Sequence, residues 1–224
     1  MRMSFQLLII AFVCSMTTGL YAESVYKSVP IKVDVSKKYL FFLHGNIVEK
    51  KGLPASSRKY GDYEYEDMLE AFTDAGFVVI AEPREEDTDV FIYALKVKNQ
   101  VKKLLKAGVP ESNITVSGYS KGGRMTLYVS SLLKNNNVNF IVLAGCPMAY
   151  VGDDEVKLFG NMLSIYDQRD DMFDSCDKYF AVGDKGLKTK EIVLDTGEGH
   201  GLFYNVTDDW VIPAIKWAKE GKLQ

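Results

Sequence analysis

The sequence has very few of the residues that most often bind metal ions. Its 224 residues include two histidines, His44 and His200, and three cysteines. The two histidines lie far apart in the chain, and the acidic residues are scattered without the short ligand spacing of a zinc site. A phosphate-binding glycine loop of the Walker type is also missing. The sequence therefore predicts neither a metal nor another cofactor.

The chain also lacks an excess of basic charge. It carries 27 Lys and Arg against 30 Asp and Glu, a formal net charge of −3. A protein that binds nucleic acid, or that attaches to a membrane surface through a polybasic segment of its own, would show an excess of basic residues. We therefore expect no nucleic-acid partner. The length and the 47% of hydrophobic residues fit one soluble globular domain with a sizeable core.

No hydrophobic run is long enough to span a membrane. The apolar run at 5–13 is well short of the ~18–20 residues that a span requires. It follows Arg2 and precedes small and polar residues that end at Ala22, an order typical of a secretory signal. We expect a signal peptide at 1–22, a single domain at 23–224, and an exported protein, periplasmic or secreted, with no stable membrane insertion after cleavage. A non-cleaved anchor is the alternative.

Two cysteines, Cys146 and Cys176, remain after such a cleavage. An even number of cysteines in an exported chain allows a disulfide. Their spacing does not decide between a disulfide and two separate buried thiols, so both alternatives stay open.

Short apolar runs alternate with amphipathic segments along most of the chain. The runs at 38–44, 77–82, 113–118, 138–145, 161–167 and 190–195 predict strands, and the segments at 63–76, 89–108, 122–135, 172–184 and 208–221 predict helices. Continuously apolar strands separated by helices are typical of a mostly parallel sheet covered on both faces. The fold class is therefore α/β, and ligands of such sheets bind at the carboxyl ends of the strands. The segment at 25–37 shows no clear pattern.

The stretch GYSKGG at 118–123 places Ser120 between a predicted strand and a predicted helix. A sharp strand-to-helix turn needs residues without large side chains around the serine, and Gly118 and Gly122 meet that need. Such a turn exposes the serine hydroxyl above the sheet and directs the amide of Lys121 toward the space in front of it. The pattern predicts a nucleophile at Ser120.

A serine nucleophile needs a base, and His200 follows the last predicted strand at the same edge of the sheet. The base in turn needs a carboxylate that holds its tautomer. Asp170 is our first choice because it lies several residues beyond the end of a strand. Asp167 and then Asp171 are the alternatives, and helix capping is the ordinary role for each of them. Asp195 is a further possibility, although it lies at the end of the last predicted strand.

The run FFLHGN ends the first clear strand. We expect the amide of Asn46 to join that of Lys121 in an oxyanion hole. His44 itself is expected to pack and form hydrogen bonds beneath the loop.

In the order of these motifs the chain resembles the α/β-hydrolase superfamily. The order is strand and His-Gly, strand and Gly-x-Ser-x-Gly, strand and Asp, strand and His, from about residue 38 to the end. The resemblance implies Ser120 as nucleophile, His200 as general base and acid, and Asp170 as orienting acid. The segment at 146–160 is too short for a cap domain, so the resemblance is to serine esterases without a cap.

The predicted function is hydrolysis of a small-molecule carboxylic ester or thioester through an acyl-enzyme on Ser120. The alternatives are an acyltransferase with the same residues and a non-catalytic binding protein that keeps the fold. We expect the loop at 46–67 to form one wall of the pocket with its tyrosines. Arg58 and Arg84 are candidates for binding an anionic group.

Overall fold

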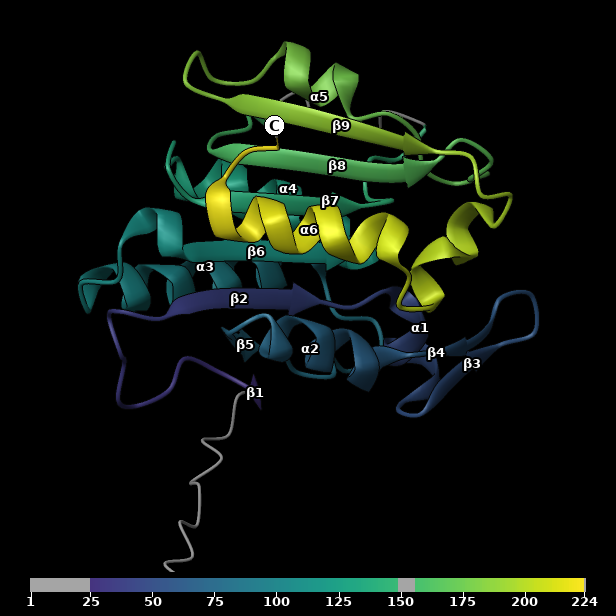
Figure 1. The fold of residues 1–224 in the computed structure, drawn as a ribbon, viewed down its shortest axis with the longest axis horizontal. Helices are drawn as coiled ribbons and strands as arrows, with labels where there is room; N and C mark the ends of the chain where they lie inside the picture. Colours follow the sequence, from purple (N-terminus) through teal and green to yellow (C-terminus); the bar gives the residue numbers. More distant parts are fainter. Residues whose placement is uncertain (1–24, 149–155, 224) are drawn as a thin grey trace, which may run out of the picture.

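The computed structural model describes residues 25–148 and 156–223. The predicted signal peptide at 1–22 lies outside the described residues. Seven strands form one sheet in the order β1-β5-β2-β6-β7-β8-β9, and all neighbouring strands are parallel (Figure 1). The strands are β1 (Val25–Tyr26), β2 (Lys38–Leu43), β5 (Phe77–Ile80), β6 (Ile114–Tyr119), β7 (Asn139–Leu143), β8 (Asn161–Asp167) and β9 (Lys188–Leu194).

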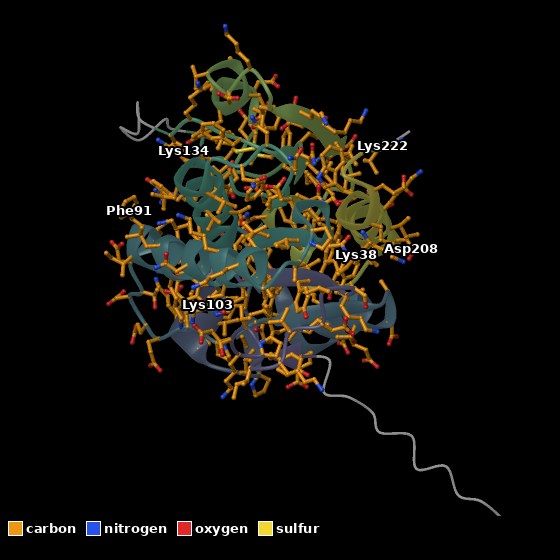
Figure 2. The ribbon with its side chains drawn as sticks, turned by 90° about the vertical axis from the view of Figure 1, so that its left-hand side faces the viewer. Lys38, Phe91, Lys103, Lys134, Asp208 and Lys222 are labelled. Carbon is orange, nitrogen blue, oxygen red and sulfur yellow. A yellow bond between two sulfur atoms is a disulfide. The ribbon has the colours of Figure 1, made fainter. Side chains whose placement is uncertain are left out.

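Helices cover both faces of this sheet, as the sequence predicts. The helices are α1 (Asn46–Lys51), α2 (Tyr65–Asp74), α3 (Val90–Lys106), α4 (Lys121–Leu133), α5 (Asp177–Ala181) and α6 (Asp208–Glu220), with 3-10 turns at Glu111–Asn113 and Gly199–Tyr204. In Figure 1, α2 and α6 lie in front of the sheet and α3 and α4 behind it. Figure 2 looks along the strands and shows Lys103 of α3 and Lys222 beyond α6 on opposite sides of the sheet.

Two apolar clusters, one on each face, form the core. On the face of α2 and α6, Phe42 of β2 packs with Phe72 and Trp210. On the opposite face, Phe41 packs with Val97 of α3 and other side chains of α3 and α4. Neighbouring strand residues point to opposite faces, so a strand buried on both must be apolar throughout. This is why the central strands lack an alternating pattern.

The structure differs from the sequence prediction mainly in short elements. The segment at 46–63 contains α1 and a small antiparallel hairpin of β3 (Ala55–Ser57) and β4 (Gly61–Tyr63). The helix expected over 172–184 is reduced to α5, and β9 begins two residues earlier than expected. Pro213 lies inside α6. Proline has no N–H to donate to the carbonyl of Asp209, four residues before it. Asp209 is exposed, so water can bind that carbonyl instead.

The carboxyl ends of the parallel strands meet at one edge of the sheet, at the right in Figure 1. The loops that follow β2, β6, β8 and β9 carry His44, Ser120, Asp170 and His200. Within 25–148 and 156–223 the connection from β7 to β8 contains no helix or strand that could form a cap domain. In the same ranges no helix has the length and apolarity that crossing a bilayer takes.

Candidate active site

Ser120 occupies a tight turn between β6 and α4. Its backbone has a φ of 55° and a ψ of −118°, a conformation that residues other than glycine rarely adopt. Neighbouring backbone segments pack closely against the glycines of this turn. A Cβ atom on Gly118 would lie 2.2 Å from the carbonyl oxygen of Gly122, and one on Gly122 would lie 1.9 Å from that of Leu43. The glycines around Ser120 are therefore a steric requirement of this turn.

Ser120, His200 and Asp170 form a continuous chain of hydrogen bonds. The hydroxyl of Ser120 lies 3.0 Å from Nε2 of His200, and Nδ1 of His200 lies 2.7 Å from Oδ2 of Asp170. The second carboxylate oxygen of Asp170 accepts hydrogen bonds from the backbone amides of Met172 and Phe173. With both oxygens of Asp170 engaged, the imidazole is held with its proton on Nδ1 and its Nε2 lone pair toward Ser120.

Two aromatic rings pack against the imidazole of His200. The ring of Phe173 stacks on it at 5.1 Å between centroids and an interplanar angle of 14°, and the ring of Tyr119 lies 5.0 Å away. The hydroxyl of Tyr119 also donates a hydrogen bond of 2.8 Å to the carbonyl oxygen of His200. Burial raises the pKa of Tyr119 well above its usual range, so the hydroxyl keeps the proton that it donates.

The three alternative carboxylates have other partners. Asp167 accepts hydrogen bonds from the amides of Arg169 and Thr196 and from the Thr196 hydroxyl. Burial of Asp167 acts to raise its pKa, but these hydrogen bonds outweigh it and leave the pKa below the usual value. Asp171 is exposed and pairs with Lys59. Asp195 is exposed and pairs with Arg169. Among the four candidates, only Asp170 contacts His200.

The two expected oxyanion amides belong to the first residues of two helices. Asn46 begins α1 and Lys121 begins α4, and both line the same pocket as Ser120 and His200. Amides in the first turn of a helix have no acceptor within the helix. The structure thus brings together all five residues that the sequence singled out: Ser120, Asp170 and His200, with Asn46 and Lys121.

A buried ionic network lies beside this pocket. The carboxylate of Glu49 binds Nε of Arg84 at 2.8 Å and also pairs with the ammonium group of Lys121. Arg84 donates its backbone amide to Nε2 of His44 and a guanidinium N–H to the His44 carbonyl. Burial, together with the charges of Arg84 and Lys121, lowers the pKa of His44 to about 3. His44 is therefore neutral and packs beneath the loop, as expected.

This network corrects one expectation about anion binding. Arg84 is buried and bound to Glu49, so its charge does not face the pocket. Arg58 is exposed and does not line the pocket either. Of the tyrosines in the loop, Tyr60 lines the pocket, whereas Tyr63 and Tyr65 belong to the core.

The pocket itself has a volume of about 420 Å³. Besides Asn46, Tyr60, Ser120, Lys121 and His200, it is lined by Gly45, Ile47, Lys50, Tyr119, Arg124, Met172, Phe173 and Tyr204. Sequence analysis missed Phe173 and Arg124, although both are near predicted residues: Phe173 lies three positions after Asp170, and Arg124 lies four after Ser120. The spacing of four positions places Arg124 one helical turn from Ser120, and from this spacing the sequence could have predicted that Arg124 lies near the site.

Cys146 and Cys176 form a disulfide, which decides the alternative that the sequence left open. Their Cα atoms are 5.3 Å apart. The bond joins the loop after β7 to the segment just beyond Phe173, and the amide of Asp174 donates to the Cys146 carbonyl across the same junction. The disulfide therefore braces the segment that carries Asp170.

In the described part of the chain, no group of three His, Cys, Asp or Glu side chains is arranged to hold a metal ion.

The sequence matches no family model, and no curated protein is significantly similar to it. Solved structures do resemble it. SOBER1 of Arabidopsis thaliana has a TM-score of 0.55 at 14% identity, over 83% of this chain and 99% of that one. The esterase PE8 has a TM-score of 0.54 at 17% identity, over 87% and 99%. The Bacillus cereus carboxylesterase has a TM-score of 0.52 at 15% identity, over 84% and 91%.

These likenesses extend over most of the chain and concern the fold. Together with the parallel sheet and its two layers of helices, they show that the chain has the α/β-hydrolase fold, as the resemblance of its motifs indicated.

Proposed function

We propose that this protein is a serine hydrolase that cleaves a small-molecule carboxylic ester or thioester. The observation that carries the proposal is the chain of hydrogen bonds from Ser120 through His200 to Asp170. The names of the structural neighbours PE8 and the Bacillus cereus carboxylesterase support an ester as the substrate class.

In the first half of the proposed reaction, Nε2 of His200 takes the proton of the Ser120 hydroxyl while Oγ attacks the substrate carbonyl carbon. The carbonyl oxygen becomes an oxyanion, which the amides of Lys121 and Asn46 stabilise. The imidazolium then gives its proton to the leaving alcohol or thiol as the carbon–oxygen or carbon–sulfur bond breaks. The acyl group remains on Ser120.

In the second half, water replaces the leaving group. Nε2 of His200 takes a proton from water, the hydroxide attacks the acyl carbon, and a second tetrahedral intermediate forms. The proton returns to Oγ of Ser120 as the carboxylic acid leaves. Asp170 stays ionised throughout and stabilises the imidazolium.

The first experiment is covalent labelling of the mature protein with a fluorophosphonate, followed by mass spectrometry of the modified peptide. Label is expected on Ser120, because its hydroxyl lies against a base. The variant His200→Ala should lose the label while it remains folded by circular dichroism. Ser117→Ala is the matched control, since Ser117 is a buried serine of β6, three residues before Ser120, and has no catalytic partner. A folded, unlabelled wild-type protein would contradict the proposal.

We also propose that the chain is exported after cleavage of a signal peptide. The apolar run at 5–13 supports this, and so does the disulfide between Cys146 and Cys176, since stable disulfides are typical of oxidising compartments. Fractionation of the native host, with the mass of the purified protein, tests it. A mature chain that begins near residue 23 is expected; a full-length chain in the cytosol would contradict it.

A further inference from the structure

The side chains that line the pocket carry charge of only one sign. Lys50 and Lys121 contribute ammonium groups and Arg124 a guanidinium, while no aspartate or glutamate is among the lining residues of the described structure. A pocket of this volume with a few polar groups at fixed positions is typical of a small-molecule site. The question is whether these charges are already neutralised by neighbours.

Lys121 is largely neutralised, but the network around it is not. Its ammonium group pairs with Glu49, which also binds Arg84. Two cations therefore share one carboxylate, and the buried network keeps a net positive charge. Because burial weakens screening by water, this charge raises the electrostatic potential of the adjoining pocket.

Arg124 and Lys50 have no ionic partner in the part of the chain that the structure describes. Arg124 is half-buried in the first turn of α4, one turn beyond Ser120, and Lys50 is exposed in the last turn of α1. A half-buried guanidinium without a partner can bind a carboxylate or phosphate through two parallel hydrogen bonds. Lys50 is more exposed, so its charge contributes less.

The pocket lining also includes aromatic rings. Tyr60 and Tyr204 are 5.2 Å apart between ring centroids, and Phe173 stacks on His200. All three line the pocket, and they come from the β3–β4 hairpin, the Asp170 segment and the turn at Gly199–Tyr204. A ligand that fits this lining has an apolar part against these rings and an anionic end near Arg124 and Lys50.

We propose that the pocket selects esters or thioesters that carry an anionic group, a carboxylate or a phosphate, on their acyl or alcohol part, and that Arg124, aided by Lys50, binds that group. This inference rests on the proposed hydrolysis by Ser120. It replaces the expected roles of Arg58 and Arg84 with those of two other cations that line the pocket.

The test uses pairs of substrates that differ in charge but hardly in shape. For the alcohol part, the pair is 4-acetoxybenzoate and the neutral 4-acetoxybenzamide. For the acyl part, it is the 4-nitrophenyl half-ester of adipic acid and the corresponding ester of adipamic acid. The quantity compared is the ratio of kcat/KM for the anionic and the neutral member of each pair.

For at least one pair we expect the wild-type ratio to exceed one and Arg124→Gln to lower it about threefold to tenfold, as befits a partly buried ion pair. Arg124→Lys should keep an intermediate ratio, and Lys50→Gln should lower it less. The control is Lys103→Gln, which removes the same charge from exposed α3; Lys103 is labelled in Figure 2, which faces the amino ends of the strands. That variant should leave the ratio unchanged.

The outcomes separate this inference from the function on which it rests. Hydrolysis of the neutral esters with ratios near one, or ratios that Arg124→Gln leaves unchanged for both pairs, overturns the charge selectivity alone. Failure to label Ser120 and to cleave any ester overturns the proposed hydrolase and the selectivity together. An anionic preference that falls in Arg124→Gln and weakens with added salt supports the proposal.

Discussion

Asp167 and Asp170 show how strongly the partners of a side chain decide what it can do. Both are buried carboxylates within one short segment that follows β8. Asp167 accepts hydrogen bonds that fasten Arg169 and Thr196, whereas Asp170 binds the imidazole of His200. From the sequence they differ only in their distance from the end of the strand.

We predict that Asp170→Asn lowers kcat about 10³-fold to 10⁴-fold, because an amide cannot hold His200 in the required tautomer or stabilise its charged form. The measurement is steady-state hydrolysis of a 4-nitrophenyl ester. Asp167→Asn is the matched control. It should keep most of kcat and lose about 1–2 kcal/mol of stability through its weakened hydrogen bonds. The reverse pattern in the two variants would identify Asp167 as the orienting acid.

His44 should make the stability of the protein depend on pH. Its pKa is about 3 in the folded protein, mainly through burial, against an ordinary value near 6.5. Between these values the unfolded chain binds a proton that the folded one does not, so the free energy of unfolding falls as the pH falls. The slope that a single such group adds is about 1.4 kcal/mol per pH unit.

Urea unfolding of wild type and His44→Gln between pH 7 and pH 4 measures this contribution. The other titrating groups are shared, so the difference in slope isolates His44. We expect the wild type to lose stability more steeply over this range. Parallel pH profiles would show that His44 titrates normally in the folded protein.

At the scale of secondary-structure elements, Glu49 is the residue that joins separate parts of the site. It lies on α1, and its two oxygens bind Lys121 at the start of α4 and Arg84 beyond β5. Because α1 begins with Asn46 and α4 with Lys121, the same carboxylate holds the two proposed oxyanion amides at a fixed separation. Removing one partner of a buried ionic network leaves the others unpaired.

Glu49→Gln is therefore expected to lower the free energy of unfolding by about 3 kcal/mol. Urea denaturation at pH 7 provides the measurement. Glu70→Gln on α2 is the control, since Glu70 is exposed and has no ionic partner among the described residues. Equal stability of the two variants would argue that the network contributes nothing to the fold.

The sequence predicted those elements that have a strong local pattern. The central strands are long apolar runs, and the turn at Ser120 is specified by its own glycines, so both were recognisable. The β3–β4 hairpin has three residues in each strand, which is too few for a periodic pattern. The partner of Arg84 could not be predicted, because Glu49 lies 35 positions away and meets it only through the fold.

For the whole molecule, the disulfide between Cys146 and Cys176 is the covalent link across the active-site edge. It closes a loop with a sequence separation of 30, and a loop of that length corresponds to about 3–4 kcal/mol of stabilisation through restriction of the unfolded chain. The segment between the two cysteines contains β8 and, just after it, Asp170.

We predict that the double variant Cys146→Ala and Cys176→Ala unfolds about 6–15 °C below the wild type in differential scanning calorimetry. The wild type heated with a thiol reductant serves as the control and should show a similar decrease. Identical melting temperatures with and without reductant would mean that the bond is absent from the purified protein.

The last strand of the sheet has a consequence for association between molecules. In the described structure β9 ends the sheet, so one row of its backbone amides and carbonyls has no neighbouring strand. Lys188 and Lys190 are exposed on this strand. A strand from a second molecule that paired with this row would come close to the ammonium groups of Lys188 and Lys190. These charges therefore disfavour edge-to-edge pairing of two molecules along β9.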